Sequence, residues 1–179
     1  MCSDISPQTK DSIYLDATKK FPFDDAVFNY VYSEHMIEHI SREAGEFMLQ
    51  ECYRVLKQGG RIRIATPDLA KIVNLYALRE EGFGLDYINW ITDKFIKKPT
   101  DYNPLIVLNT MFRNWYHCFL YDEEFLIQSL QNVGFTDIKR YSINMSDDEN
   151  LRGIERHHLN VGNFEMVEFE TMIYEAEKL

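Results

Sequence analysis

Two histidines and a glutamate stand at a spacing that can bind a metal ion, in the segment His35-Met36-Ile37-Glu38-His39. Histidines four positions apart share one helix face, where both imidazoles can bind Zn²⁺, and a neighbouring glutamate can act as a general base. A zinc hydrolase acting through His35 and His39 is therefore one hypothesis. Such a site needs a third protein ligand, and the many acidic residues of the chain leave that requirement open.

The residues around this motif predict a strand, a helix and a second strand. A short apolar run at 27–32 reads as the first strand, and apolar residues three and four apart predict an amphipathic helix over 42–57. Gly59 and Gly60 are typical of a helix stop, and a strand is expected at 61–67. This βαβ order predicts a parallel sheet with covering helices. Because the histidine motif directly follows a strand, we expect it to bind no zinc.

The rest of the chain predicts helices followed by a strand pair. Residues 68–120 are expected to form a helical, aromatic insertion that could serve as a lid or substrate wall, within one domain spanning 1–179. Asp122 is a typical N-cap and Gly134 a typical stop for a further helix. Three more elements are expected: a short strand at 12–17, a helix over 67–81 opened by Pro67-Asp68, and an antiparallel pair at 136–143 and 167–179.

Composition limits the functions open to the chain. It has 179 residues and a net charge of −10, which argues against nucleic acid as the main partner. No apolar run reaches the length of a membrane span, and the first residues lack a signal-peptide core, so we expect a cytoplasmic protein without a membrane partner. The three cysteines are far apart and predict neither disulfides nor a thiolate zinc site.

Several short pieces follow one another in a fixed order around the histidine motif. They are Asp16, Phe21-Pro22-Phe23, Asp24-Asp25, Phe28-Asn29-Tyr30-Val31, Ser33, His35 to His39, and Glu51 to Gly60. This ordered set resembles the middle of a class I S-adenosylmethionine-dependent methyltransferase of the type 11, small-molecule group. The resemblance implies an α/β, Rossmann-like, mainly parallel sheet with flanking helices and an antiparallel C-terminal strand pair. It also implies S-adenosylmethionine as cofactor and a small molecule as methyl acceptor.

The resemblance also implies roles for individual residues. Asp4 would bind the ribose hydroxyls and Asp16 with Ala17 the adenine, while Ser33, Glu34 and His35 would lie beside the cofactor at a strand end. On the acceptor side, His117 or His35 would act as the base. The residues expected to bind the acceptor are Arg113, Trp115, Tyr116, Glu155 and His157.

One part of the family pattern has no counterpart in the sequence. The first, central strand and its glycine-rich loop are not matched, and no G-x-G occurs before Gly59. We therefore expect weak cofactor binding by these 179 residues, and a second copy of the chain is a candidate to complete the sheet. An inactive methyltransferase-fold remnant that serves as an interaction protein is the alternative to an enzyme.

Overall fold

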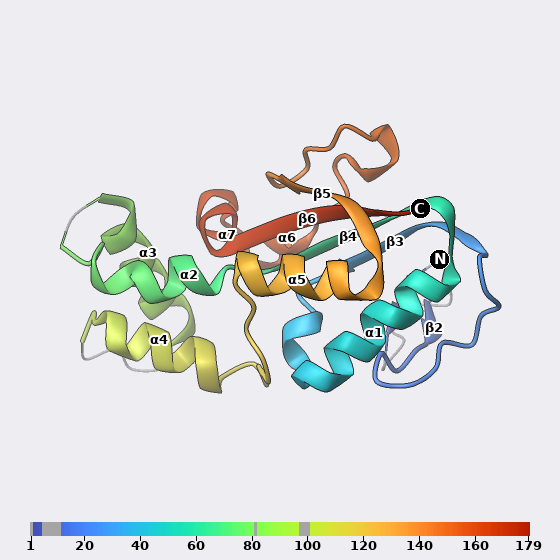
Figure 1. The fold of residues 1–179 in the computed structure, drawn as a ribbon. Helices are drawn as coiled ribbons and strands as arrows, with labels where there is room; N and C mark the ends of the chain where they lie inside the picture. Colours follow the sequence, from blue (N-terminus) through green and yellow to red (C-terminus); the bar gives the residue numbers. More distant parts are fainter. Residues whose placement is uncertain (1, 5–11, 81, 97–100) are drawn as a thin grey trace.

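The computed structural model describes residues 2–4, 12–80, 82–96 and 101–179 (Figure 1). The strands of this part form two sheets. Strands β1 (Cys2–Asp4) and β2 (Ser12–Tyr14) pair in parallel as a small sheet. The main sheet has the order β3-β4-β6-β5. Its strands are β3 (Phe28–Glu34), β4 (Leu56–Pro67), β5 (Phe135–Tyr141) and β6 (Thr171–Lys178).

The main sheet contains both parallel and antiparallel strand pairs, and it agrees with the predicted α/β class. Strands β3 and β4 run parallel, with Val31 opposite Ile62 and Ser33 opposite Ile64. Strand β6 is antiparallel to both β4 and β5, so the expected antiparallel C-terminal pair is confirmed. Tyr30 of β3 is 37% exposed, and β3 is an outer strand of the main sheet.

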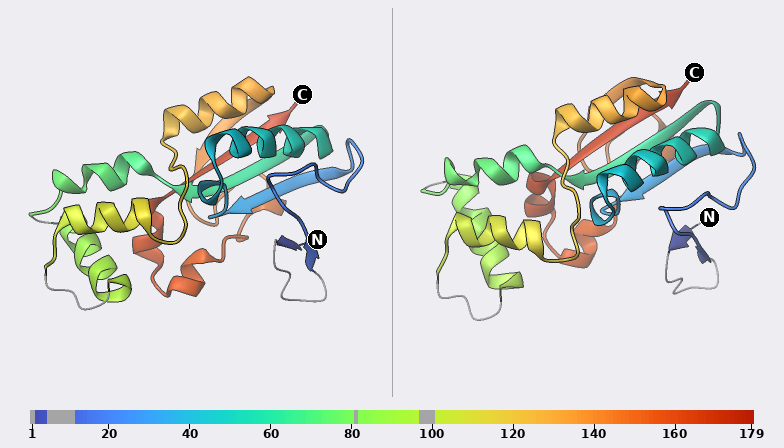
Figure 2. Two further views of the ribbon diagram at one scale, coloured as in Figure 1. Left: turned by 90° about the horizontal axis from the view of Figure 1, so that it is seen from below. Right: turned by 60° about the horizontal axis from the view of Figure 1, so that its bottom comes forward.

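Helices α1 (Arg42–Val55) and α5 (Glu123–Val133) cover one face of the main sheet (Figure 2). Both begin at a side-chain cap, since Ser41 accepts a hydrogen bond from the amide of Ala44 and Asp122 accepts one from the amide of Phe125. Gly134 ends α5 in the left-handed conformation, as predicted. Apolar side chains of α1, α5 and the strands form the largest core cluster.

The predicted role of Gly59 and Gly60 as a helix stop is wrong. Helix α1 already ends at Val55, and both glycines lie inside β4. The pairing of β3 with β4 is irregular there, because Phe28 is opposite Leu56 while Tyr30 is opposite Arg61. Gly59 has a φ of +73°, and a Cβ on Gly60 would lie 2.8 Å from the carbonyl oxygen of Lys57. The glycines therefore allow the extra residues of β4 to fold out of register.

A helical region extends from the end of β4 and has its own apolar cluster (Figure 1). It contains α2 (Leu69–Val73), a 3-10 turn at Asn74–Tyr76, α3 (Gly82–Phe95) and α4 (Pro104–Arg113). Asp68 caps α2 as predicted, but the single helix expected over 67–81 is wrong, because the chain tightens into the 3-10 turn at Asn74. In the described part of the chain no helix is long and apolar enough to cross a membrane.

The other face of the main sheet carries a polar loop and two short helices. These helices are α6 (His157–Val161) and α7 (Phe164–Glu170), and a 3-10 turn at Glu149–Leu151 precedes them (Figure 2). The strand predicted over 167–179 begins only at Thr171. The reason is that Asn163 caps α7 by accepting a hydrogen bond from the amide of Met166, which starts a helical turn there.

A buried ionic cluster joins this loop to the sheet. The Arg63 side chain on β4 has no exposed surface and donates hydrogen bonds to the carboxylates of Glu155, at 2.6 Å, and Glu175. It also donates to the carbonyl oxygen of Met145 at 2.9 Å. Glu155 in turn accepts a hydrogen bond from the amide of Asn144 at 2.7 Å. One guanidinium therefore neutralises two buried carboxylates and holds the loop on the sheet.

We predict that Arg63→Met lowers the free energy of unfolding by about 3–5 kcal/mol, because it leaves two buried carboxylates without a counter-charge. Urea denaturation measures the change. The matched control is Arg42→Met, which removes a half-exposed arginine from surface ion pairs and should cost less than about 1 kcal/mol. Equal losses for the two variants would contradict a dominant role for the buried cluster.

Candidate functional site

The candidate site begins where β3 ends. Glu34 is the last residue of β3 and pairs with Ala65 of β4, so both strands deliver their carboxyl ends to the same edge of the sheet. His35 follows with a φ of +45°, a left-handed conformation that is uncommon outside glycine. A 3-10 turn at Ile37–His39 completes the motif. The carboxyl ends of parallel strands are the usual place for ligands in α/β sheets.

Glu38 lies at the centre of this turn and is completely buried. One carboxylate oxygen, Oε2, accepts a hydrogen bond from the Thr66 hydroxyl at 3.0 Å. The other, Oε1, has no hydrogen-bond partner in the part of the chain that the structure describes, although His35 Nδ1 lies 3.3 Å from it and His39 Nε2 lies 4.0 Å from it. Burial by itself would raise the pKa of Glu38, but the ion pair with His35 lowers it overall.

Both ring nitrogens of His35 have partners. Nδ1 faces Glu38, and Nε2 lies 3.2 Å from the Thr171 hydroxyl. Burial lowers the pKa of His35, but the facing Glu38 carboxylate outweighs this effect and raises the pKa overall. The His35 ring stacks on the ring of His157 with centroids 3.8 Å apart. Burial and the neighbouring His35 lower the pKa of His157 to about 4.

A second pair of histidines lies on the other side of Glu38. The ring centroids of His39 and His117 are 5.0 Å apart. The segment bearing His117 is held in place by the backbone, because the carbonyl oxygen of Glu38 accepts hydrogen bonds from the amides of Cys118 and Phe119. Burial lowers the pKa of His117, and its Nδ1 lies 2.6 Å from the carbonyl oxygen of Met111.

Glu34 anchors the polar loop rather than facing an open site. Its carboxylate accepts hydrogen bonds from the backbone amides of Arg156 and His157, at distances between 2.9 and 3.0 Å. These amides belong to the first turn of α6, where helix amides lack internal partners. The predicted contact of Glu34 with a cofactor would therefore compete with two charge-assisted hydrogen bonds.

The other residues expected to bind the cofactor lie at or near strand ends. Asp4 is the last residue of β1, and its side chain lies outside the described part of the structure. Asp16 follows β2 and accepts hydrogen bonds from the amide and hydroxyl of Thr18, which lower its pKa to about 2. Ala17 is half-buried beside it. Ser33 is buried in β3, and its hydroxyl has no hydrogen-bond partner among the described residues.

The residues expected to bind the acceptor are only partly brought together. His157 stacks on His35, and the Trp115 ring lies near the His117 ring, tilted by 52° and with centroids 5.7 Å apart. Tyr116 is 91% exposed, and Arg113, at the end of α4, is also exposed. The Glu155 carboxylate is buried and paired with Arg63, so binding the predicted acceptor would require breaking this ion pair.

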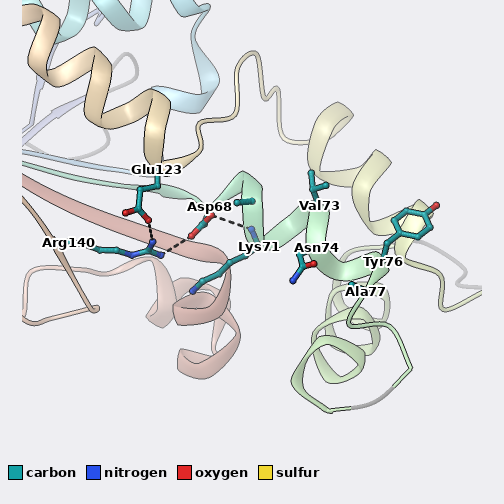
Figure 3. A pocket seen from close by; sticks show the side chains of 9 residues that line it. Asp68, Lys71, Val73, Asn74, Tyr76, Ala77, Glu123 and Arg140 are labelled. Atoms are coloured by element: carbon teal, nitrogen blue, oxygen red, sulfur yellow. Dashed lines mark hydrogen bonds and ion pairs between the residues drawn. The ribbon is translucent and has the colours of Figure 1, made fainter.

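A shallow pocket beside β4 offers a different set of polar groups (Figure 3). Arg140 donates hydrogen bonds to Asp68 at 2.8 Å and to Glu123 at 2.5 Å, and Asp68 also caps α2. Lys71 points along the same wall. Both carboxylates of this pocket are already paired with Arg140.

Sequence reasoning found His35 and Glu38 through their motif but missed the residues that they contact. The hydroxyls of Thr66 and Thr171 lie on neighbouring strands, 28 and 136 positions from the residues they contact. His117 was predicted separately, as a base in an aromatic segment. Nothing in the spacing indicated that it faces His39.

Comparisons with known proteins address the fold and the family. Residues 4–64, about a third of the chain, match the family model described as a methyltransferase domain. No curated protein matches the chain. Among solved structures, an S-adenosylmethionine-dependent methyltransferase from Archaeoglobus fulgidus is similar, with 18% identity and a TM-score of 0.53. The match covers 98% of this chain and 74% of that one.

Two further structures give a similar result. A Thermotoga maritima S-adenosylmethionine-dependent methyltransferase has 16% identity and a TM-score of 0.52, over 94% of this chain and 63% of that one. A structure of the Haloferax volcanii Trm112 methyltransferase activator with a methyltransferase has 14% identity and a TM-score of 0.54, over 96% and 63%. This chain thus spans about two thirds of their length. At these identities the likeness establishes the fold alone.

We predict that Glu34→Ala increases amide exchange at Arg156 and His157 by about 10- to 100-fold. Each lost hydrogen bond to a charged acceptor is worth about 1.5–3 kcal/mol. Hydrogen-exchange NMR measures the two amides directly. Glu46→Ala, which removes an exposed carboxylate from α1, is the control and should leave both unchanged. Unchanged exchange in Glu34→Ala would show that another group protects these amides.

Proposed function

We propose that the chain is an S-adenosylmethionine-dependent methyltransferase that acts on a small molecule. The observation that carries this proposal is the family match over residues 4–64. The same residues supply the last residue of β1, all of β2 and β3 and most of β4, together with the histidine turn. The candidate site therefore lies within and directly beside the segment that resembles the family, at the strand ends where α/β proteins bind ligands.

The residues present fit the cofactor at some positions and not at others. The buried Ser33 hydroxyl has no partner among the described residues, which suits a hydrogen bond to a bound ligand. Asp4 ends β1, and Asp16 and Ala17 come shortly after the parallel strand β2, as expected for ribose and adenine contacts. Glu34 fits less well, because both of its oxygens hold backbone amides. We therefore assign the cofactor to Asp4, Asp16, Ala17, Ser33 and the backbone near His35.

The chemistry of methyl transfer makes modest demands on the protein. S-adenosylmethionine supplies an electrophilic methyl group on a sulfonium. The protein must align the acceptor with that methyl group and exclude water from the contact. We assign the acceptor side to the histidines around Glu38, with Trp115 as a neighbouring aromatic wall. A small molecule suits this site better than nucleic acid, because the chain carries a net charge of −10.

We predict that Ser33→Ala weakens the binding of S-adenosylhomocysteine by up to about 10-fold, the worth of one hydrogen bond, while the free energy of unfolding changes by less than about 1 kcal/mol. An NMR titration measures weak affinities as well as strong ones. The matched control is Ser129→Ala in α5, whose hydroxyl donates to the carbonyl oxygen of Phe125. It should leave the affinity unchanged.

Two results would contradict the proposal. If S-adenosylhomocysteine causes no shifts near residues 12–35 at millimolar concentration, the cofactor assignment fails. If it binds, but no S-adenosylhomocysteine forms when S-adenosylmethionine is incubated with a panel of small amines and hydroxyl compounds, a non-catalytic binding protein is favoured instead.

A further inference from the structure

Glu38, His39 and His117 come together around one point beside the 3-10 turn. Each offers one donor atom, and these atoms all lie within 4.8 Å of one another. The cluster combines a carboxylate with two imidazoles, one of them from a segment 78 positions further along the chain. His39 is about one third exposed, so the cluster can be reached from solvent.

The Glu38 carboxylate has an unsatisfied oxygen that faces this point. The side chain is fully buried, and among the described residues Oε1 accepts no hydrogen bond, whereas Oε2 accepts one from Thr66. A buried carboxylate oxygen without a hydrogen bond is stabilised by a nearby cation. The ion-pair partner His35 lies 3.3 Å from Oε1 and His39 lies 4.0 Å from it, so Oε1 keeps lone pairs for a further ligand. The oxygen is thus available as a ligand.

The tautomer of His117 also suits a ligand. A carbonyl oxygen only accepts hydrogen bonds, so the 2.6 Å contact with Met111 requires that His117 Nδ1 carries the proton. Nε2 then has a free lone pair. Metal-binding histidines almost always donate their second ring N–H to a carbonyl or carboxylate in this way, which fixes the ring for coordination.

We propose that Glu38, His39 and His117 bind a divalent first-row transition-metal ion such as Zn²⁺. Two imidazoles and one carboxylate are the ligand set of open zinc sites, which keep a further position for water or a substrate oxygen. The ligands must move closer to bind the ion, since tetrahedral ligands at about 2.05 Å lie about 3.3 Å apart, and Glu38 Oε1 and His39 Nε2 are now 4.0 Å apart.

This ligand set differs from the one that the H-x-x-E-H spacing indicates. In that pattern His35 and His39 would bind the ion together. Here His35 is occupied by Thr171 and Glu38, so it supports the carboxylate ligand instead of binding the metal. The proposal revises the expectation that the motif is metal-free, and it assigns His117 to an ion rather than to the role of a base.

Titration calorimetry with Zn²⁺ on the chelator-treated, purified chain tests the proposal. We expect one ion per chain with micromolar or tighter affinity. His39→Ala and His117→Ala should each weaken binding by about 100-fold or more, because each removes one of three ligands. His158→Ala is the matched control, since it removes a histidine outside the cluster, and it should leave the affinity unchanged.

A further variant separates the two ligand sets. His35→Ala removes a supporting contact and should weaken binding by about 10- to 100-fold, the usual range for such partners. It should therefore cost less than His117→Ala. No stoichiometric Zn²⁺ in the unaltered chain, or unchanged affinity in His117→Ala, would overturn the proposal. A His35→Ala loss larger than that of His117→Ala would assign the ion to His35 and His39.

The assay distinguishes this proposal from the proposed function, because it contains neither cofactor nor acceptor. Circular dichroism and thermal melting of each metal-free variant report whether it folds. If His117→Ala does not fold, His39→Ala still tests the site, because His39 is partly exposed and its removal opens no core cavity.

Discussion

The burial of the Glu38 carboxylate is the constraint on which the candidate site depends. A fully buried carboxylate is tolerated only where hydrogen bonds and positive charge surround it. Thr66 donates to one oxygen, and His35 supplies the charge near the other. The carbonyl oxygen of the same residue accepts two amides from the segment that follows His117. One residue thus joins β4, the 3-10 turn and the end of the helical region.

Buried charge organises the opposite face of the sheet in a similar way. Arg63 holds Glu155 and Glu175 beneath the polar loop, and Glu34 holds the first amides of α6. The contacts of Arg63 and those of Glu34 both hold the segment that places the His157 ring against the His35 ring. The position of the stacked histidines therefore follows from ionic contacts as much as from apolar packing. These contacts are directional, so they specify one loop arrangement where apolar contacts would allow several.

The proposed methyl transfer and the proposed metal ion concern adjoining parts of one site. Ser33 and the strand ends face the position assigned to the cofactor, whereas His39 and His117 face the position assigned to the ion. An open coordination position would hold an oxygen or nitrogen of the acceptor and favour loss of its proton. In that case the histidine cluster would select acceptors that bind metals, which a purely apolar pocket would not do.

The sequence by itself determined the local elements, because their signals act over a few residues. Periodicity located α1 and β4, while Asp122 and Gly134 marked the ends of α5. The order of the short motifs around His35 to His39 also predicted the α/β fold. Local signals gave the wrong prediction at Gly59 and Gly60. These glycines lie in the irregular pairing of β3 with β4 and not at a helix end.

Only the tertiary structure decided which polar groups meet. The sequence predicts Glu155 as an acceptor-binding residue, but the fold places Arg63 beside it, and strand pairing places Glu175 opposite Arg63. His117 became a neighbour of His39 because amides of Cys118 and Phe119 bind the carbonyl oxygen of Glu38. Such contacts join residues about 80 to 90 positions apart, and no spacing along the chain encodes them. They arise because buried charges and backbone groups must find partners inside the fold.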